Sequence, residues 1–401
     1  MKKVPEIRFA EYVDDWEQRK LSDLIIEYKE TVDSECDLPV LTSSKTDGVV
    51  LQEEHFGRKQ QHDITGYNIL PRGYCTYRNR SDGVDFTFNI NKCCDKGIIS
   101  KFYPVFYGNN SDVFFISLVL NHSEEVVHEI GYTCTGTGQK VLSFLDLLKM
   151  HITIPSYDEQ KKIASYFEQL DSLITLHQRK LEKLMQFKSS MLEKMFPKNG
   201  ESVPEIRFAG FTGAWEQREL GELAVEVKRK AEKDSDAPVM MISAAEGFID
   251  QSQRYSNNNA GSSLKNYTLL YEGELAYNHG YSKFRNFGSV FDLRVEKARI
   301  PFVYHSFALP EDDHRFYAYY LNSGLFDGEL KKLVSSTARM DGLLNISYED
   351  YMSIPVLRPP VKEQKKIGRF LTSLDDLITL HQRKLEKLKQ FKSGLLDKMF
   401  I

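Results

Sequence analysis

The sequence predicts a mixed α/β (α+β) fold that occurs twice in one chain. Two α/β domains are separated by two long helices, which pair as an antiparallel coiled coil about a pseudo-twofold axis. Three observations predict this arrangement. The stretch LITLHQRKLEKL at 173–184 recurs unchanged at 377–388. Apolar residues around both copies follow a heptad spacing. The segments between them break into short apolar runs interrupted by Gly, Asn and Asp, which is typical of short strands and turns.

Further repeats divide the chain into two equivalent halves. The repeated stretches are VPEIRFA at 4–10 and 203–209, WEQR at 16–19 and 215–218, EQKKI at 159–163 and 363–367, and KMF at 194–196 and 398–400. A helix-ending Pro197, followed by Asn and Gly, marks the junction. We therefore expect an N-terminal segment and a first mixed domain over 1–154, a repeat helix over 155–199, a second mixed domain over 200–354 and a second repeat helix over 355–401.

The repeat helices have one apolar seam each. No Gly or Pro occurs over 158–196, and steps of four and three residues select mostly apolar positions. The first seam is Ile163, Phe167, Leu170, Ile174, His177, Leu181, Leu184, Lys188, Met191 and Met195, and the second is Ile367, Leu371, Leu374, Ile378, His381, Leu385, Leu388, Lys392, Leu395 and Met399. Each helix is roughly 60 Å long at 1.5 Å per residue. The His and Lys interruptions indicate register-setting polar positions, with a titratable switch at the histidine as the alternative.

The domain interiors have diverged but keep a common skeleton. Gly48 and Gly73 correspond to Gly247 and Gly273, and Ser143-Phe144 corresponds to Ser347-Tyr348. The two domains are therefore expected to share a fold while their surface chemistry differs.

Composition narrows the function classes. The chain has 401 residues, 41% hydrophobic and 27% charged, as in an ordinary soluble protein. The net charge of −4 argues weakly against nucleic acid, although an acidic average can include basic loops. We see no signal peptide and no apolar run long enough for a membrane helix. The five cysteines lie only in the first half and include no C-x-x-C pair, which favours reduced thiols of a cytosolic protein.

The order of these segments resembles the specificity subunit of a type I restriction–modification enzyme. The most specific marks are P-x-x-x-E-Q-K-K-I at 155–163 and 359–367 and L-D-x-L-I-T-L-H-Q-R-K at 170–180 and 374–384. The resemblance covers the entire chain. It implies two target recognition domains, each reading one half of a bipartite, asymmetric sequence in double-stranded DNA. It also implies that the repeated helices dock two methyltransferase subunits, which restriction subunits then join.

The same resemblance implies a bacterial cytoplasmic protein that binds no cofactor itself. S-adenosylmethionine belongs to the partner methyltransferase, which modifies adenine N6, and ATP and Mg belong to the restriction subunit. The residues agree with a non-catalytic role. We find no Asn/Asp-Pro-Pro-aromatic motif, no G-x-x-x-x-G-K-[ST] loop and no H-E-x-x-H motif. The acidic run 311–313 is interpreted as a solvated turn in preference to a metal site.

Candidate DNA-contacting residues are polar, basic or aromatic side chains in loops of the two domains. In the first domain they are Ser43, Ser44, Lys45, Arg58, Lys59, Gln60, Tyr77, Arg78, Asn79, Arg80, Thr137, Gln139 and Lys140. In the second domain they are Gln253, Arg254, Tyr277, Asn278, Tyr281, Lys283, Arg285, Asn286, Ser336, Thr337 and Arg339. The clusters after Gly73 and Gly273 are favoured, because they occupy equivalent positions and differ in sequence as two unlike half-sites require. The alternative for each residue is an ordinary polar surface loop.

Candidate partner-binding residues lie on the outer faces of the helices. They are Gln178, Arg179, Lys183, Gln382, Arg383 and Lys387. Solvated charge is the alternative, but identity between copies whose domains have diverged favours docking of the same partner twice. The competing function for the whole chain is a coiled-coil scaffold that presents two protein- or glycan-binding domains. A self-sufficient methylase or nuclease is disfavoured by the missing motifs.

Overall fold

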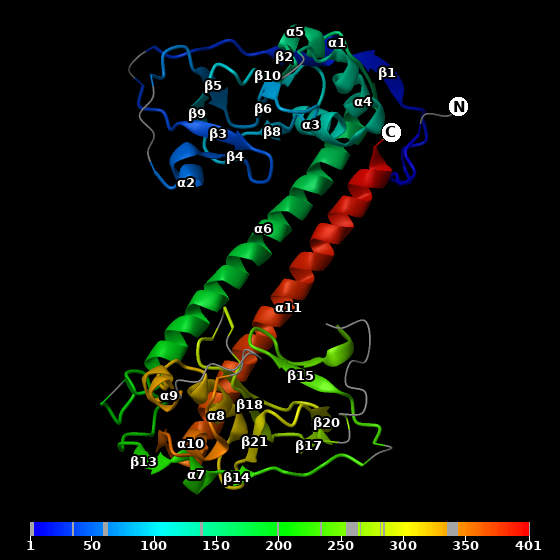
Figure 1. Ribbon diagram of the computed structural model, residues 1–401. Helices are drawn as coiled ribbons and strands as arrows, with labels where there is room; N and C mark the ends of the chain where they lie inside the picture. Colours follow the sequence, from blue (N-terminus) through cyan, green and yellow to red (C-terminus); the bar gives the residue numbers. More distant parts are fainter. Residues whose placement is uncertain are drawn as a thin grey trace. The chain divides into compact units, whose positions relative to one another are not determined.

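The computed structural model describes residues 4–33, 36–58, 63–136, 139–198, 200–232, 235–253, 264, 266–280, 282–283, 285–334 and 344–400. The chain forms two compact units. Unit 1 comprises residues up to 178 together with those from 383 onward, and unit 2 comprises 179–382. Each unit contains one mixed domain, called head 1 and head 2 below, and one end of each long helix (Figure 1). These contact-based units divide the chain within the helices, so the four sequence boundaries stay a prediction.

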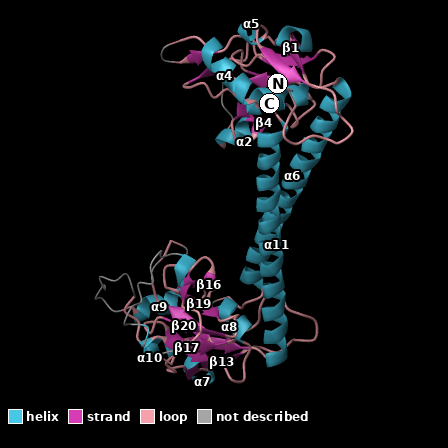
Figure 2. Ribbon diagram, turned by 90° about the vertical axis from the view of Figure 1, so that its right-hand side faces the viewer, coloured by secondary structure: helices cyan, strands magenta, loops and turns pink. Residues whose placement is uncertain are grey.

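Head 1 is built from short antiparallel strands and small helices (Figure 2). Its central sheet has the order β2 (Ile25–Glu27), β10 (Val105–Gly108), β6 (Cys75–Tyr77), β8 (Phe88–Ile90). The paired strands around it are β1 (Glu17–Lys20) with β12 (His151–Ile154), β3 (Leu41–Ser44) with β4 (Gly48–Leu51), β5 (Asn68–Pro71) with β9 (Lys96–Ile99), and β7 (Arg80–Ser81) with β11 (Lys140–Val141). The helices are α1 (Leu21–Leu24), α2 (Gln52–Phe56), α3 (Val113–His122), α4 (Glu124–Thr133) and α5 (Phe144–Leu147).

Head 2 repeats this plan. Its central sheet has the order β14 (Val225–Glu226), β21 (His305–Ala308), β18 (Leu275–Asn278), β19 (Ser289–Asp292). The paired strands are β13 (Glu216–Glu219) with β22 (Pro355–Arg358), β15 (Met240–Ser243) with β16 (Gly247–Asp250), and β17 (Thr268–Tyr271) with β20 (Lys297–Ile300). The helices are α7 (Leu220–Leu223), α8 (His314–Leu321), α9 (Asp327–Leu333) and α10 (Tyr348–Met352), with a 3₁₀ turn at Gln251–Gln253. The predicted mixed fold and its duplication are confirmed.

The residues that match between the halves fix turns and helix starts. Gly48 and Gly247 adopt φ values of 72° and 80° at the ends of equivalent hairpin turns. Glycine adopts this left-handed conformation without a steric penalty. Ser143 and Ser347 cap α5 and α10, and each side chain accepts a hydrogen bond from the backbone N–H three residues later. The common skeleton of the two sequences is therefore a set of backbone constraints.

Each head completes its hydrophobic core with residues from both long helices. In unit 1, Phe167 at the start of α6 (Tyr157–Lys194) and Phe400 beyond the end of α11 (Val361–Met399) pack in one cluster with Trp16. In unit 2 the equivalent cluster contains Leu371 of α11, and Phe196 beyond the end of α6. The start of one helix and the end of the other thus close each core.

The predicted seam faces inward in both units. All its residues are buried or half-buried, while most of their helical neighbours are exposed. The two lysines that interrupt the seam form interhelical ion pairs: Lys392 Nζ lies 2.5 Å from Asp171 Oδ1 in unit 1, and Lys188 Nζ lies 2.5 Å from Asp375 Oδ1 in unit 2. In unit 1 the ring of Phe167 packs against Phe400 while Asp171 contacts Lys392, so the two helix segments run antiparallel (Figure 1).

The repeated VPEIRFA stretch is a strap between the two helices of each unit. In unit 1, Arg8 donates two 2.7 Å hydrogen bonds to the buried Glu159 carboxylate, and Ile7 N donates to Lys398 O at 3.0 Å. In unit 2, Arg207 donates to Glu363 at 2.6 and 2.7 Å, and Ile206 N donates to Lys194 O at 2.9 Å. In unit 1 these contacts join the first residues of the chain to the end of α11. In unit 2 the equivalent contacts are made next to the covalent junction between the two halves of the chain.

We predict that Glu363→Ala destabilises the chain by about 3–5 kcal/mol, because it leaves the Arg207 guanidinium buried without a counter-charge. Arg207 is 10% exposed and Glu363 0%. Glu222→Ala is the matched control, since its pair with Arg218 is about half exposed and should contribute at most about 1 kcal/mol. Denaturant unfolding of the full chain measures both. Equal losses for the two variants would contradict the structural role of the strap.

Candidate nucleic-acid interface

Three predicted clusters of head 1 meet at the turn between β3 and β4. Lys45 in this turn forms an ion pair with Asp85, and Ser81 Oγ donates a 2.7 Å hydrogen bond to the same carboxylate. Ser81 lies opposite Lys140 in the β7–β11 ladder. The hairpin turn, the segment after β6 and the segment before α5 are far apart in sequence, and the structure places them side by side.

Hydrogen bonds hold this turn in place. Asn89 Nδ2 donates to Ser43 Oγ at 2.8 Å and to Ser44 O at 2.9 Å, which fastens the hairpin to β8. The ammonium of Lys45, followed by the Ser81 hydroxyl, lowers the pKa of the Asp85 carboxyl below its ordinary value. The carboxylate is therefore ionised at neutral pH. This surface presents a fixed cation beside a fixed anion.

The remaining head 1 candidates differ in position. Arg78 and Arg80 are exposed, and the Arg80 guanidinium lies 4.5 Å from the centroid of the Phe102 ring. Arg58 is exposed after α2, Gln139 is exposed before β11, and Asn79 is half-buried. Lys59, Gln60 and Thr137 lie outside the described residues.

Tyr77 and Tyr277 are core residues, so their prediction as DNA contacts is wrong. They are 0% and 1% exposed. Tyr77 Oη donates to Leu142 O at 3.0 Å and Tyr277 Oη donates to Phe287 O at 2.7 Å. Burial raises the pKa of both phenols well above the ordinary value. Tyr77 is the last residue of β6 and Tyr277 lies within β18, and in both strands the side chain packs inside the head and cannot reach a DNA groove.

Head 2 has a recess at the equivalent position. It has a volume of about 380 Å³ and lies between the β15–β16 turn, with Ala244 and Ala245, and the loop that contains Gly280 and Lys283. Asn278 positions this loop: its Nδ2 donates to Ile242 O at 3.3 Å and its Oδ1 accepts from Gly280 N at 3.0 Å. Lys283 is exposed and forms no ion pair with any described residue.

Of the other candidate residues of head 2, only Arg285 and Asn286 lie among the residues whose side chains the structure describes. Arg285 is half-buried, its backbone closes a turn with Ser282, and burial lowers its pKa. Asn286 is exposed. Arg254, Tyr281, Ser336, Thr337 and Arg339 lie outside the described residues, as does the side chain of Gln253.

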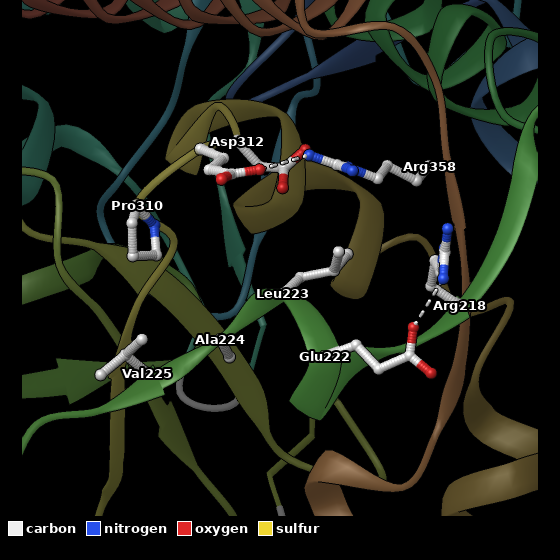
Figure 3. A pocket seen from close by; sticks show the side chains of 9 residues that line it. Arg218, Glu222, Leu223, Ala224, Val225, Pro310, Asp312 and Arg358 are labelled. Atoms are coloured by element: carbon white, nitrogen blue, oxygen red, sulfur yellow. Dashed lines mark hydrogen bonds and ion pairs between the residues drawn. The ribbon is translucent and has the colours of Figure 1, made fainter.

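A second pocket of head 2 is lined by two arginines and three carboxylates that form ion pairs with one another (Figure 3). It has a volume of about 320 Å³. Arg358 Nε donates to Asp312 Oδ1 at 2.9 Å, and Arg218 pairs with Glu222 at 3.3 Å. Asp312 also accepts a 2.6 Å hydrogen bond from Gln364 in the first turn of α11. The acidic run 311–313 is thus not simply a solvated turn, because the side chain of Asp312 is only 1% exposed and anchors β22 and α11.

The outer faces of the long helices carry the predicted partner residues and an unpredicted apolar set. Gln178 is half-buried, and Arg179, Lys183, Gln382, Arg383 and Lys387 are exposed. The apolar residues are Leu173, Leu176 and Phe391 in unit 1 and Leu377, Leu380 and Phe187 in unit 2, all between 42% and 61% exposed. Each unit thus presents the same Leu-Leu-Phe set. The signal was available in the sequence, because these residues are identical between the copies yet lie off the seam.

The structure contains no membrane-length apolar helix and no cluster of three or more metal-ligating side chains within its described residues.

Comparison with known proteins gives a consistent result. The family model described as "Type I restriction modification DNA specificity domain" matches twice, over residues 13–186 and 213–390. The fold is similar to the S subunit of a type I restriction–modification system from M. genitalium, with 15% identity, a TM-score of 0.55 and 99% of each chain covered. A chain from a study of complex assembly in a type I system has 14% identity and a TM-score of 0.44, with 96% and 97% covered. The HsdS subunit from Thermoanaerobacter tengcongensis has 14% identity and a TM-score of 0.42, with 96% of each chain covered.

Because the two family matches together span most of the sequence and coincide with its two halves, the chain belongs to the type I restriction–modification DNA specificity family, whose role is non-catalytic.

Proposed function

We propose that this chain reads a bipartite, asymmetric sequence in double-stranded DNA and brings methyltransferase and restriction subunits to it. One observation carries the proposal. The two heads have the same strand order in their central sheets, but they carry different side chains at the equivalent hairpin turn. At the hairpin turn, head 1 has the Lys45–Asp85 ion pair and head 2 has an open recess beside Lys283. Equivalent scaffolds with different surface chemistry suit two unlike half-sites.

The long helices support the idea of a fixed gap between the half-sites. Each is one continuous helix, of 38 residues in α6 and 39 in α11, and each contributes to both units. In the proposal they set the number of unread base pairs, as the spacing of paired DNA-binding modules does elsewhere.

Each unit offers one docking face for a methyltransferase subunit. The repeated Leu-Leu-Phe set is apolar and solvent-exposed, and repeated Arg and Lys residues flank it. Exposed apolar residues rimmed by charge are characteristic of protein interfaces. Two equivalent faces fit two copies of one partner. That partner holds S-adenosylmethionine, and the restriction subunit holds ATP and Mg, so the chain itself needs no cofactor in the bacterial cytoplasm.

The direct test is to co-express the chain with its methyltransferase subunit in a host without adenine methylation and to map modified adenines across the genome. We expect a single motif with two unlike halves around a constant gap. A soluble complex with the methyltransferase that leaves every adenine unmodified would instead favour the scaffold function.

Docking is tested with Leu176→Lys and Leu380→Lys, alone and together. These side chains are 61% and 45% exposed, so the fold should persist while a charge enters the apolar face. We expect one methyltransferase to be lost from each single variant and both from the double variant, as measured by native mass spectrometry.

Val13→Lys is the control, since Val13 is 80% exposed and lies outside the repeat helices. Retention of two methyltransferase subunits by the double variant would exclude this face as the docking site.

A further inference from the structure

The exposed Lys45–Asp85 pair of head 1 places a hydrogen-bond donor and a hydrogen-bond acceptor side by side on the surface. Its two side chains are 64% and 63% exposed, so both are accessible from solvent. They come from different segments, the β3–β4 turn and the stretch between β7 and β8. An isolated surface ion pair of this kind contributes little to stability. Here, however, three hydrogen bonds from two further side chains fix its position: one from the Ser81 hydroxyl to Asp85 and two from the Asn89 amide to the hairpin.

We propose that Lys45 and Asp85 together read one G·C base pair in the half-site contacted by head 1. This inference rests on the proposed function and specifies the chemistry by which one of the two heads would contact its half-site.

The donor and acceptor groups match those of a G·C pair. Guanine presents two acceptors, N7 and O6, in the major groove, and cytosine presents the N4 amino donor beside them. A lysine ammonium only donates hydrogen bonds, and an ionised carboxylate only accepts them. In the proposal the Lys45 ammonium therefore donates hydrogen bonds to guanine N7 or O6, and the Asp85 carboxylate accepts a hydrogen bond from the N4 amino group of cytosine. The ion pair keeps the two side chains adjacent before DNA arrives, which reduces the entropy lost on binding.

The equivalent place in head 2 has different chemistry. Lys283 is a donor there, but no carboxylate of the described residues pairs with it. The β15–β16 turn contributes Ala244 and Ala245 to an open recess. The described residues of head 2 thus form no donor–acceptor pair at this place. In the proposal, the half of the motif that head 2 reads serves as an internal reference for changes made in head 1.

The test uses the chain in complex with its methyltransferase and compares the motifs of modified adenines. For Asp85→Asn and Lys45→Met we expect one G·C position, in one half of the motif, to relax toward other base pairs by roughly tenfold or more. The other half and the gap should stay unchanged. Asp236→Asn is the matched control, because Asp236 is 81% exposed and forms an ion pair at 2.5 Å with the half-buried Lys297 in head 2, outside the β15–β16 turn. It should leave the motif intact.

The charge-swapped double variant Lys45→Asp with Asp85→Lys separates reading from a structural role. The swap restores an ion pair, so a pair that only holds the loop would restore the parent motif. A reading pair would instead give altered preference at the same position. Restoration of the parent motif by the swap, or an unchanged motif in both single variants, would overturn the inference. A parent complex that modifies no bipartite motif would contradict the proposed function itself, which is a distinguishable result.

Discussion

Each head depends on a helix end that the other half of the chain supplies. The core of unit 1 includes Leu395, Met399 and Phe400 from the end of the second repeat, and the core of unit 2 includes Met195 and Phe196 from the end of the first. Residues of both halves therefore share each core. The interhelical pairs Lys392–Asp171 and Lys188–Asp375 join helices of different halves, and the strap N–H groups of Ile7 and Ile206 donate to the exchanged helix ends at Lys398 O and Lys194 O. The Arg–Glu pairs then join each strap to the helix of its own half.

The straps add specificity to this exchange. A buried ion pair gains little net free energy over apolar packing, because both charges must leave water. A bidentate Arg–carboxylate pair nevertheless accepts few alternative geometries. Arg8–Glu159 and Arg207–Glu363 therefore fix where each strap meets the first turn of a helix. This accounts for the survival of VPEIRFA in both copies while the neighbouring sequence diverged.

The helices, turns and helix starts were predicted well from local sequence patterns, because each depends on residue periodicity or on the backbone conformation of a single residue. The seam, the positive-φ glycines and the serine caps each leave a signature within a few residues. The positions of the candidate DNA-contacting residues were predicted only in part. Tyr77 and Arg78 are adjacent and equally suited to DNA by composition, yet one is buried in the core and the other is exposed. Tyr77 is the last residue of β6, whose three residues are all buried, and Arg78 is the first residue after it. The sequence shows no period-2 alternation that would mark this strand end. The meeting of Lys45, Asp85 and Lys140 depends on chain topology, which no local pattern encodes.

Duplication within one chain has a consequence that a dimer of identical chains cannot have. A symmetric dimer would present the same hairpin turn twice, so its two sites would be chemically equal. Here the helices and straps are held nearly constant by the exchange of core residues, while the turns are free to differ because they contribute little to either core. Lys45–Asp85 in head 1 and the recess at Ala244–Ala245 in head 2 are products of that freedom. The division between a constrained frame and unconstrained turns allows the turn of one head to change in evolution without disturbing the other head or the exposed faces of the helices.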